Sequence, residues 1–157
     1  MSLRLHPIGR VVTKASREEL RHGCAISRVI IDQKYVRGLE GLQKYSHIYV
    51  LFWLHEVSEK TETLKVHPRG RADIRKVGVF STRSPQRPNP IGLTLVRLMS
   101  KRGRFLTVRG LDAYEGTPVL DIKPYDNWDH IHRPRVPAWW RRLQRERRHK
   151  SRLGTNN

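Results

Sequence analysis

Short apolar segments recur along the whole chain, and they constrain its fold more than any other feature. They are rich in Val, Ile, Tyr, Phe and Trp, and turn residues separate several of them. The segments are residues 8–12, 25–31, 47–54, 77–80, 93–98, 105–108 and 119–122. Short runs of β-branched and aromatic residues between turns are typical of strands. We therefore predict a mainly β chain that forms a compact β-barrel or sandwich with long loops.

Two of these segments allow predictions about their faces. Residues 47–54 are apolar almost throughout, which predicts a central strand covered on both faces. In residues 119–122, the alternation of a strand places Leu120 and Ile122 on one face and Asp121 on the other. The polar connection at residues 55–76 has room for short helical pieces.

The charge balance points to a polyanionic partner. The chain carries 32 Lys and Arg against 14 Asp and Glu, a formal net charge of +18 in 157 residues. Such a field favours nucleic acid or an acidic membrane surface, although a merely soluble basic surface is the plainer alternative. The length suits one domain with a tail.

Several classes of protein are disfavoured. The longest apolar run, residues 48–54, is far shorter than the roughly 20 residues of a membrane helix, and the N-terminus lacks the apolar core of a signal peptide, so we expect a cytoplasmic protein. Cys24 is the single cysteine, which excludes an internal disulfide. The histidines lack the i, i+4 spacing of a helical metal site, and we predict no metal. Rossmann, P-loop and nucleophile-elbow motifs do not occur.

The composition changes after Tyr125. We therefore predict a barrel domain over residues 1–126 and a basic C-terminal extension over residues 127–157. Residues 133–152 hold nine Lys or Arg against the single Glu146. A helix is expected there, with Pro137 in its first turn and with Trp139, Trp140 and Leu143 as its apolar residues, ending near Gly154. A frayed, solubilising tail is the alternative.

The stretch "VFSTRSPQRPNPIG", residues 79–92, lies between two apolar segments and contains three prolines and two arginines. Pro85, Pro88 and Pro90 exclude a helix or a central strand. They also lower the entropy of the unbound loop, so that Arg83 and Arg87 are held ready for an anion or a nucleotide. A loop that only caps a barrel end is the alternative.

A second motif is "LDAYEGTPVLDIKPY", residues 111–125. Its Glu-Gly-Thr-Pro segment, residues 115–118, predicts a turn that enters a strand, with Gly116 free to take a positive φ. The amides and carbonyls of such a turn suit an adenosine or amino-acid group. On turn chemistry alone, an ordinary hairpin connection is the favoured alternative.

Together these motifs resemble one family. "GVFSTRSPQRPNPIGLTLVRL" (78–98), "LDAYEGTPVLDIKPY" (111–125) and "GLEGLQKYSHIYVLFWLH" (38–55) are similar to segments of the TsaA-like, or YaeB/TrmO, family, and the resemblance covers about residues 5–126. It implies a small β-barrel that forms a homodimer and binds S-adenosylmethionine near the dimer interface. The implied reaction methylates N6 of threonylcarbamoyladenosine beside the anticodon of threonine tRNAs.

By position, the resemblance assigns contacts with S-adenosylmethionine to four parts of the chain. The residues are His22, Gly23, Cys24, His55, Glu56, Arg83, Leu93, Glu115, Gly116, Thr117 and Pro118. Two departures concern this set: His22 stands where the family usually has Gln, and Glu115 stands where it has Asp. Many bacterial members also continue into a second C-terminal domain, in place of which this chain has its basic tail.

The implied chemistry suggests further residues. Adenine N6 bearing a carbamoyl group is a weak nucleophile, so an acceptor for its proton would help. Asp121 and Asp126 are candidates for that acceptor, and Tyr125 is a candidate for stacking on a base, although each also suits a structural role. Contacts with RNA phosphates are predicted for Arg87, Arg141, Arg142, Arg145, Arg147 and Arg148.

Two other functions compete with this one. A catalytically inactive RNA-binding or regulatory protein would keep the barrel, and the altered first loop motivates that hypothesis. A methyltransferase that acts on another RNA would keep the chemistry but change the target.

Overall fold

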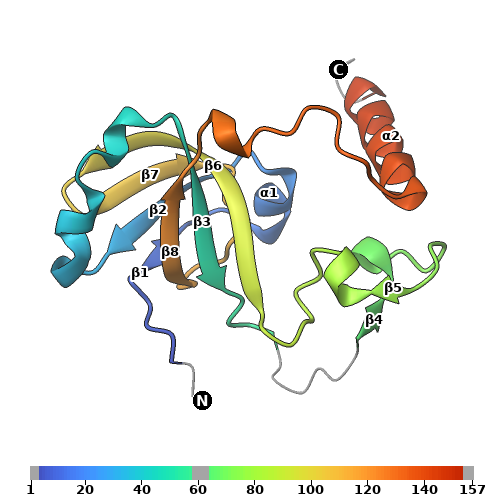
Figure 1. The fold of residues 1–157 in the computed structure, drawn as a ribbon, viewed down its shortest axis with the longest axis horizontal. Helices are drawn as coiled ribbons and strands as arrows, with labels where there is room; N and C mark the ends of the chain where they lie inside the picture. The colour runs from blue at the N-terminus through green and yellow to red at the C-terminus, as the bar shows by residue number, and fades with distance from the viewer. Residues whose placement is uncertain (1–3, 58–63, 154–157) are drawn as a thin grey trace.

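The computed structural model describes residues 4–57 and 64–153. Six antiparallel strands close into a barrel in the order β1–β2–β7–β6–β3–β8 (Figure 1). The strands are β1 (Gly9–Val12), β2 (Ile26–Ile31), β3 (His47–Trp53), β6 (Ile91–Arg102), β7 (Phe105–Arg109) and β8 (Pro118–Pro124). The prediction of a small, mainly β barrel is confirmed.

The barrel interior is filled by alternate residues of each strand. The fully buried side chains include Val11, Val29, Ile48, Val50, Val96, Leu106, Val108 and Val119. On β3, Ile48, Val50 and Phe52 are buried, whereas the intervening side chains on its outer face are half-buried. The sequence predicts that both faces of this strand are covered. In a single chain only its inner face is fully covered.

Gly9 offers a test of how tightly the barrel closes. A Cβ atom at Gly9 would overlap the backbone carbonyl of Ile30 on β2, and backbone in a closed barrel has little freedom to move away. We expect Gly9→Ala to lower the free energy of unfolding by about 2–3 kcal/mol, as overpacking does, and to lower the Tm by about 4–12 °C. Gly78→Ala is the control, because its Cβ meets nothing within 4 Å. Equal melting temperatures for the two variants would contradict the tight contact.

The pairing of β8 with β3 contains a bulge. Leu51 pairs with Asp121 but Phe52 pairs with Val119, so Leu120 is the extra residue. Consequently Val119 and Ile122 both pack against the core. The prediction that Leu120 and Ile122 share a face is wrong, because a bulge shifts the alternation by one residue.

Between β3 and β6 the chain leaves the barrel and forms a separate small unit (Figure 1). Its strands β4 (Lys65–Val66) and β5 (Val77–Gly78) pair with each other, with the 3₁₀ turns η3 (Pro68–Gly70) and η4 (Val79–Ser81) beside them. The strand predicted over residues 77–80 is thus correct only for its first half. The proline-rich loop that follows is irregular, as predicted, and β6 begins directly after Pro90.

The remaining helical elements are short, apart from the last. They are α1 (Arg17–His22), η1 (Gln33–Leu39), η2 (Leu42–Lys44), η5 (Asn127–Asp129) and α2 (Ala138–Leu153). The predicted basic helix is confirmed as α2, which starts directly after Pro137; the predicted end at Gly154 lies outside the described residues. On α2, Trp139 and Leu143 are half-buried and Trp140 is 38% exposed.

Four charged side chains join α2 to the small unit. Arg71 binds Glu146 at 2.7 Å and Asp73 at 2.7 Å, while Arg142 binds Asp73 at 2.5 Å and Glu146 at 3.0 Å. Two residues of the helix and two of the unit thus form a closed ring of alternating charge. Hydrogen bonds from Arg71 lower the pKa of Asp73 and of Glu146, and the same bonds raise the pKa of Arg71.

We expect the docking of α2 to depend on pH. The two carboxyl pKa values lie below their ordinary values, so the ring stabilises the docked helix fully above about pH 5. That contribution is lost as the pH falls through the lowered pKa values. Asp73→Asn should release the helix at neutral pH and raise the solvent accessibility of Trp139, measured by fluorescence quenching. The control is Asp32→Asn, outside the ring. Unchanged quenching in Asp73→Asn would show that the ring does not hold the helix.

Candidate cofactor and RNA site

Three predicted cofactor segments meet at one end of the barrel, which we call the rim and which comprises residues 13–24, 55–56 and 114–118. The backbone N–H of Thr13 donates to Glu115 Oε2 at 2.5 Å. Arg17 forms an ion pair with Glu56 at 2.7 Å, and its guanidinium lies 4.5 Å from the Tyr114 ring centroid. These contacts join the loop before α1 to the end of β3 and to the turn before β8.

The turn at residues 115–118 is held from several sides. The N–H of Thr117 donates to the Tyr114 carbonyl at 3.2 Å, and the N–H of Gly116 donates to the Val11 carbonyl at 3.0 Å. Gly116 has a φ of 74°, which favours glycine. The Thr117 side chain is buried, and its Oγ1 lies 3.3 Å from His55 Nδ1. A turn fixed in this way presents its backbone groups in one shape before any ligand arrives.

The first loop reaches the rim through the end of α1. Ser16 and Glu19 form a capping box at the start of this helix, and Leu20 is buried beneath it. Gly23 ends the helix with a φ of 72°, and a Cβ at Gly110 would lie 3.2 Å from the Gly23 carbonyl. The short helix therefore fixes the loop backbone while the side chains of His22 and Cys24 remain exposed.

Leu93 lies on the side of the barrel, and Arg83 lies in the proline-rich loop before β6. Leu93 is on the outer face of β6, 47% exposed and paired with Leu51 of β3. Arg83 acts electrostatically on Tyr49, which lies about 13 Å along β3 from its end at Trp53. Among the residues that the structure describes, no hydrogen bond or ion pair joins Arg83 to the rim.

Tyr49 is the centre of a second group of side chains. Its pKa is raised, first by desolvation and then by the nearby Asp129 and Tyr125, while the charge of Arg83 acts in the opposite direction. The Tyr125 ring packs edge-on against Tyr49 at 5.7 Å and against His47 at 6.4 Å. Tyr49, Tyr125 and His47 lie toward the end of β3 that is remote from the rim. We call this group, together with Arg83 and Asp129, whose charges act on Tyr49, the aromatic cluster.

The chain matches the model of the tRNA-methyltransferase O N-terminal domain over residues 15–129. It belongs to this family. The family expected from the sequence motifs is thereby confirmed, and we use the name TrmO family for it below.

Similar proteins fall into two groups by length. A probable S-adenosyl-L-methionine-binding protein of Methanothermobacter thermautotrophicus is 45% identical over 130 residues, which cover 80% of this chain and 91% of the relative. The mouse tRNA (adenine(37)-N6)-methyltransferase is 49% identical over 88 residues, 56% of this chain but only 20% of that enzyme. The crystal structure of TrmO from Pseudomonas aeruginosa superposes with a TM-score of 0.69 at 30% identity, over 88% of this chain and 62% of that one.

The residues predicted to act in methyl transfer already have structural partners in this TrmO-family barrel. Asp121 uses both oxygens: Oδ1 accepts from the N–H of Ile122 at 2.8 Å, and Oδ2 pairs with Lys123 at 2.9 Å. Asp126 accepts from the N–H of Trp128 at 2.8 Å through Oδ1 alone, as the N-cap of η5. Their chemical roles, and that of Tyr125, stay predictions.

The arginines predicted to contact RNA divide into exposed and engaged ones. Arg141, Arg145 and Arg147 are exposed on α2. Arg142 belongs to the ionic ring, and Arg87 is half-buried and donates to the Ser84 carbonyl within its own loop at 3.3 Å. The side chain of Arg148 lies outside the described residues. The exposed three are thus the ones that the fold leaves available for phosphates.

Sequence reasoning missed Thr13, Arg17 and Tyr114, which tie the TrmO-family rim together. Their residue types are common in any sequence. Their role in holding the rim together becomes visible only in the fold, where Thr13 contacts Glu115, 102 positions away, and Arg17 contacts Glu56, 39 positions away. Over residues 4–57 and 64–153, no group of three His, Cys, Asp or Glu side chains could hold a metal ion. Within the same residues no helix is both long and apolar enough to cross a membrane.

Proposed function

We propose that this protein is an S-adenosylmethionine-dependent methyltransferase that acts on N6 of an adenine in tRNA. The observation that carries the proposal is the convergence of three separate cofactor segments at the rim, through Thr13, Arg17 and Thr117. Family membership supports it, as do the names of relatives that bind S-adenosyl-L-methionine or methylate adenine 37 of tRNA.

The rim residues fit S-adenosylmethionine by shape and by charge. The backbone at Gly23 and Gly116 is held rigidly and is open to a ligand, since a Cβ at either glycine meets nothing within 4 Å. Glu56 and Glu115 place two carboxylates at the rim of a strongly basic chain, which suits a cationic ligand. His55, held against Thr117, and the exposed His22 add polar groups for the ribose and amino-acid parts.

We propose that two copies of the chain complete each site. The outer face of β6 exposes Ile91, Leu93 and Leu95, and the half-buried Tyr49 and Leu51 of β3 continue this apolar face. Covering it with a second copy removes apolar area from water, which is favourable at about 25 cal/mol per Å². The rim and the aromatic cluster lie toward opposite ends of β3. A two-fold axis across this face therefore brings the aromatic cluster of one copy toward the rim of the other.

The bound cofactor supplies a sulfonium-activated methyl group, and the residues of this chain align, shield and deprotonate the nitrogen that accepts it. We assign Tyr125 to stacking on the target base, because it lies at the aromatic cluster and is half-buried. Asp126 is the better proton acceptor of the two aspartates, because only one of its oxygens is engaged as a cap whereas both oxygens of Asp121 are.

The finer substrate that we propose is N6-threonylcarbamoyladenosine beside the tRNA anticodon, with the N6-methyl derivative as product. The test is mass spectrometry of tRNA nucleosides from a strain that lacks this protein. We expect the methylated nucleoside to disappear and to return when the gene is restored. An unchanged amount would exclude this reaction and leave a methyltransferase for another RNA.

Calorimetry with S-adenosylmethionine separates this function from an inactive RNA-binding protein. The alternative is favoured by the substitutions at His22 and Glu115, the second of which is engaged with the Thr13 backbone. A measurable heat of binding supports the enzyme, and its absence in protein that binds tRNA normally supports the alternative.

A further inference from the structure

On one side of the barrel, the only charged residues within the strands themselves are basic. The four neighbouring strands β1, β2, β7 and β6 contain no Asp or Glu. Their exposed side chains include five arginines, and none of the five forms an ion pair within the described part of the chain. They are Arg10, Arg28, Arg97, Arg102 and Arg109. We call this surface the arginine face.

The register brings the arginines into rows across the strands. Arg28 pairs with Thr107, and Thr107 also pairs with Ser100, so that a guanidinium and two hydroxyls form one row. In the next row Arg102 pairs with Phe105. Arg97 lies directly opposite Arg109. Like charges opposite each other destabilise a sheet, so the fold retains this pair at a cost to its own stability.

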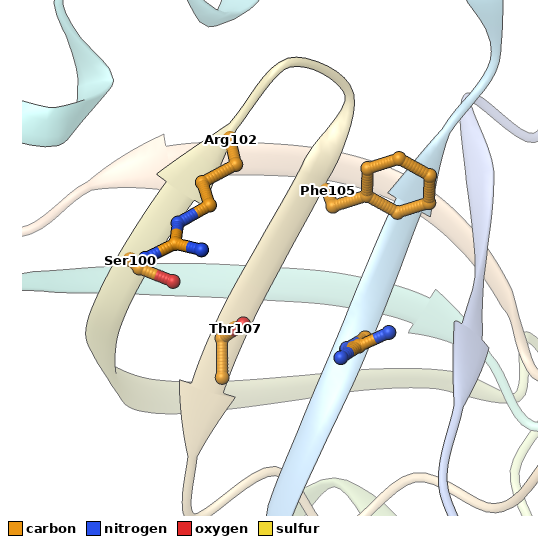
Figure 2. A pocket seen from close by; sticks show the side chains of 5 residues that line it. Ser100, Arg102, Phe105 and Thr107 are labelled. Atoms are coloured by element: carbon orange, nitrogen blue, oxygen red, sulfur yellow. The ribbon is translucent and has the colours of Figure 1, made fainter.

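The centre of the arginine face is hollowed. A shallow depression of about 220 Å³ is lined by Arg28, Ser100, Arg102, Phe105 and Thr107. Figure 2 shows Arg102 and Ser100 on β6 beside Thr107 and Phe105 on β7, with the Phe105 ring extending away from its strand. The ring is 42% exposed, and the guanidinium of Arg104 lies 5.6 Å from its centroid.

We propose that the arginine face is a second RNA-binding surface, which holds phosphates on Arg28 and Arg102 and an unpaired base on Phe105. Guanidinium and hydroxyl donors match phosphate oxygens, and an exposed aromatic ring gives a platform on which a base stacks. The inference rests on the proposed tRNA substrate, because it extends the RNA contact from α2 and the rim to the side of the barrel.

A second copy of the chain does not suit this surface. Two arginine faces related by a two-fold axis would oppose like charges, whereas RNA compensates them. In the closed strand order β7 lies across the barrel from β8, and β2 lies across it from β3. β6 belongs to both surfaces, but β3 pairs with it only over Ile91–Arg97, whereas the depression uses Ser100 and Arg102 near its other end. The depression therefore stays open when two copies pack through β3 and the first part of β6, and it is available to the same RNA molecule.

The test is the affinity of the full chain for tRNA over a range of salt concentrations, without cofactor. Arg28→Gln/Arg102→Gln should bind about tenfold more weakly at 0.1 M salt, and the slope of log K against log salt should fall by about 1.5, as two lost phosphate contacts require. The matched control is Arg4→Gln/Arg37→Gln, which removes the same charge from exposed positions outside the arginine face: Arg4 precedes β1 and Arg37 lies in η1. An equal loss in both double variants would assign the effect to net charge and overturn the proposal.

Phe105→Leu tests the base contact separately. It keeps an apolar side chain but removes the ring, so an anticodon stem–loop should bind about five- to tenfold more weakly with an unchanged salt slope. A fully paired RNA of equal length should bind as before. If wild type and Phe105→Leu bind the stem–loop with equal affinity, Phe105 is not a stacking site. If the arginine double variant loses binding to anionic vesicles but keeps its binding to RNA, the arginine face binds membranes instead.

The readouts separate this inference from the proposed reaction. In the arginine variants we expect unchanged S-adenosylmethionine affinity and an unchanged methylation rate at saturating tRNA, with a raised KM. If the protein transfers no methyl group but its RNA binding still depends on the arginine face, the proposed reaction is refuted and the proposed RNA-binding surface stands. If the arginine variants methylate tRNA and bind it as tightly as wild type, only the proposed RNA-binding surface is refuted.

Discussion

Gly116→Val is expected to weaken S-adenosylmethionine binding by about 100-fold or more. Gly116 has a φ of 74° in the middle of the rim turn, and a β-branched residue in that conformation costs on the order of 1–3 kcal/mol. To relieve the strain the turn must change shape, which displaces the backbone between Glu115 and Thr117 that the cofactor is proposed to contact. Isothermal titration calorimetry measures the loss.

Gly103→Val is the matched control for this substitution. Gly103 has a φ of 56° in the turn between β6 and β7, away from the rim, and a Cβ there also meets nothing within 4 Å. Both variants should therefore lose similar stability in thermal unfolding, but only Gly116→Val should lose cofactor affinity. Wild-type affinity in a folded Gly116→Val protein would remove the turn from the site.

Arg83→Ala is expected to lower cofactor affinity by about 10- to 100-fold without affecting the fold, as loss of a charge-assisted hydrogen bond does. Arg83 is exposed, and its charge acts on Tyr49 of the aromatic cluster, whereas no hydrogen bond or ion pair joins it to the rim within the described residues. In the proposed dimer, Arg83 contacts the cofactor at the rim of the second copy. Calorimetry gives the affinity, and circular dichroism checks the fold.

Mixing two defective chains tests the shared site directly. After unfolding and refolding together, Arg83→Ala and Gly116→Val chains should form mixed dimers in which one site combines the intact Arg83 of one copy with the intact Gly116 of the other. About a quarter of the wild-type sites should then return by random assembly. No recovery in a mixture that sedimentation shows to be dimeric would place both residues in the same copy's site.

In the small unit and in α2, the sequence predicts local structure better than it predicts tertiary contacts. The apolar residues 77–80 match a strand in composition, but only Val77 and Gly78 pair, because the partner β4 is two residues long. Helix α2 was recognisable from Pro137 and its tryptophans. Its docking was not, because Arg71 and Glu146 are ordinary charged residues until the fold places them 2.7 Å apart.

The strand content, the irregular proline loop and about half of the rim residues were predictable from the sequence alone. They rest on local physics: the pairing preference of β-branched residues, the fixed φ of proline, and motifs that occupy continuous stretches of chain. Only the tertiary structure decided that β8 carries a bulge at Leu120 and that the arginines of β2, β6 and β7 share one face. Strand register and barrel closure create these relations, and both depend on pairings between residues far apart in the chain.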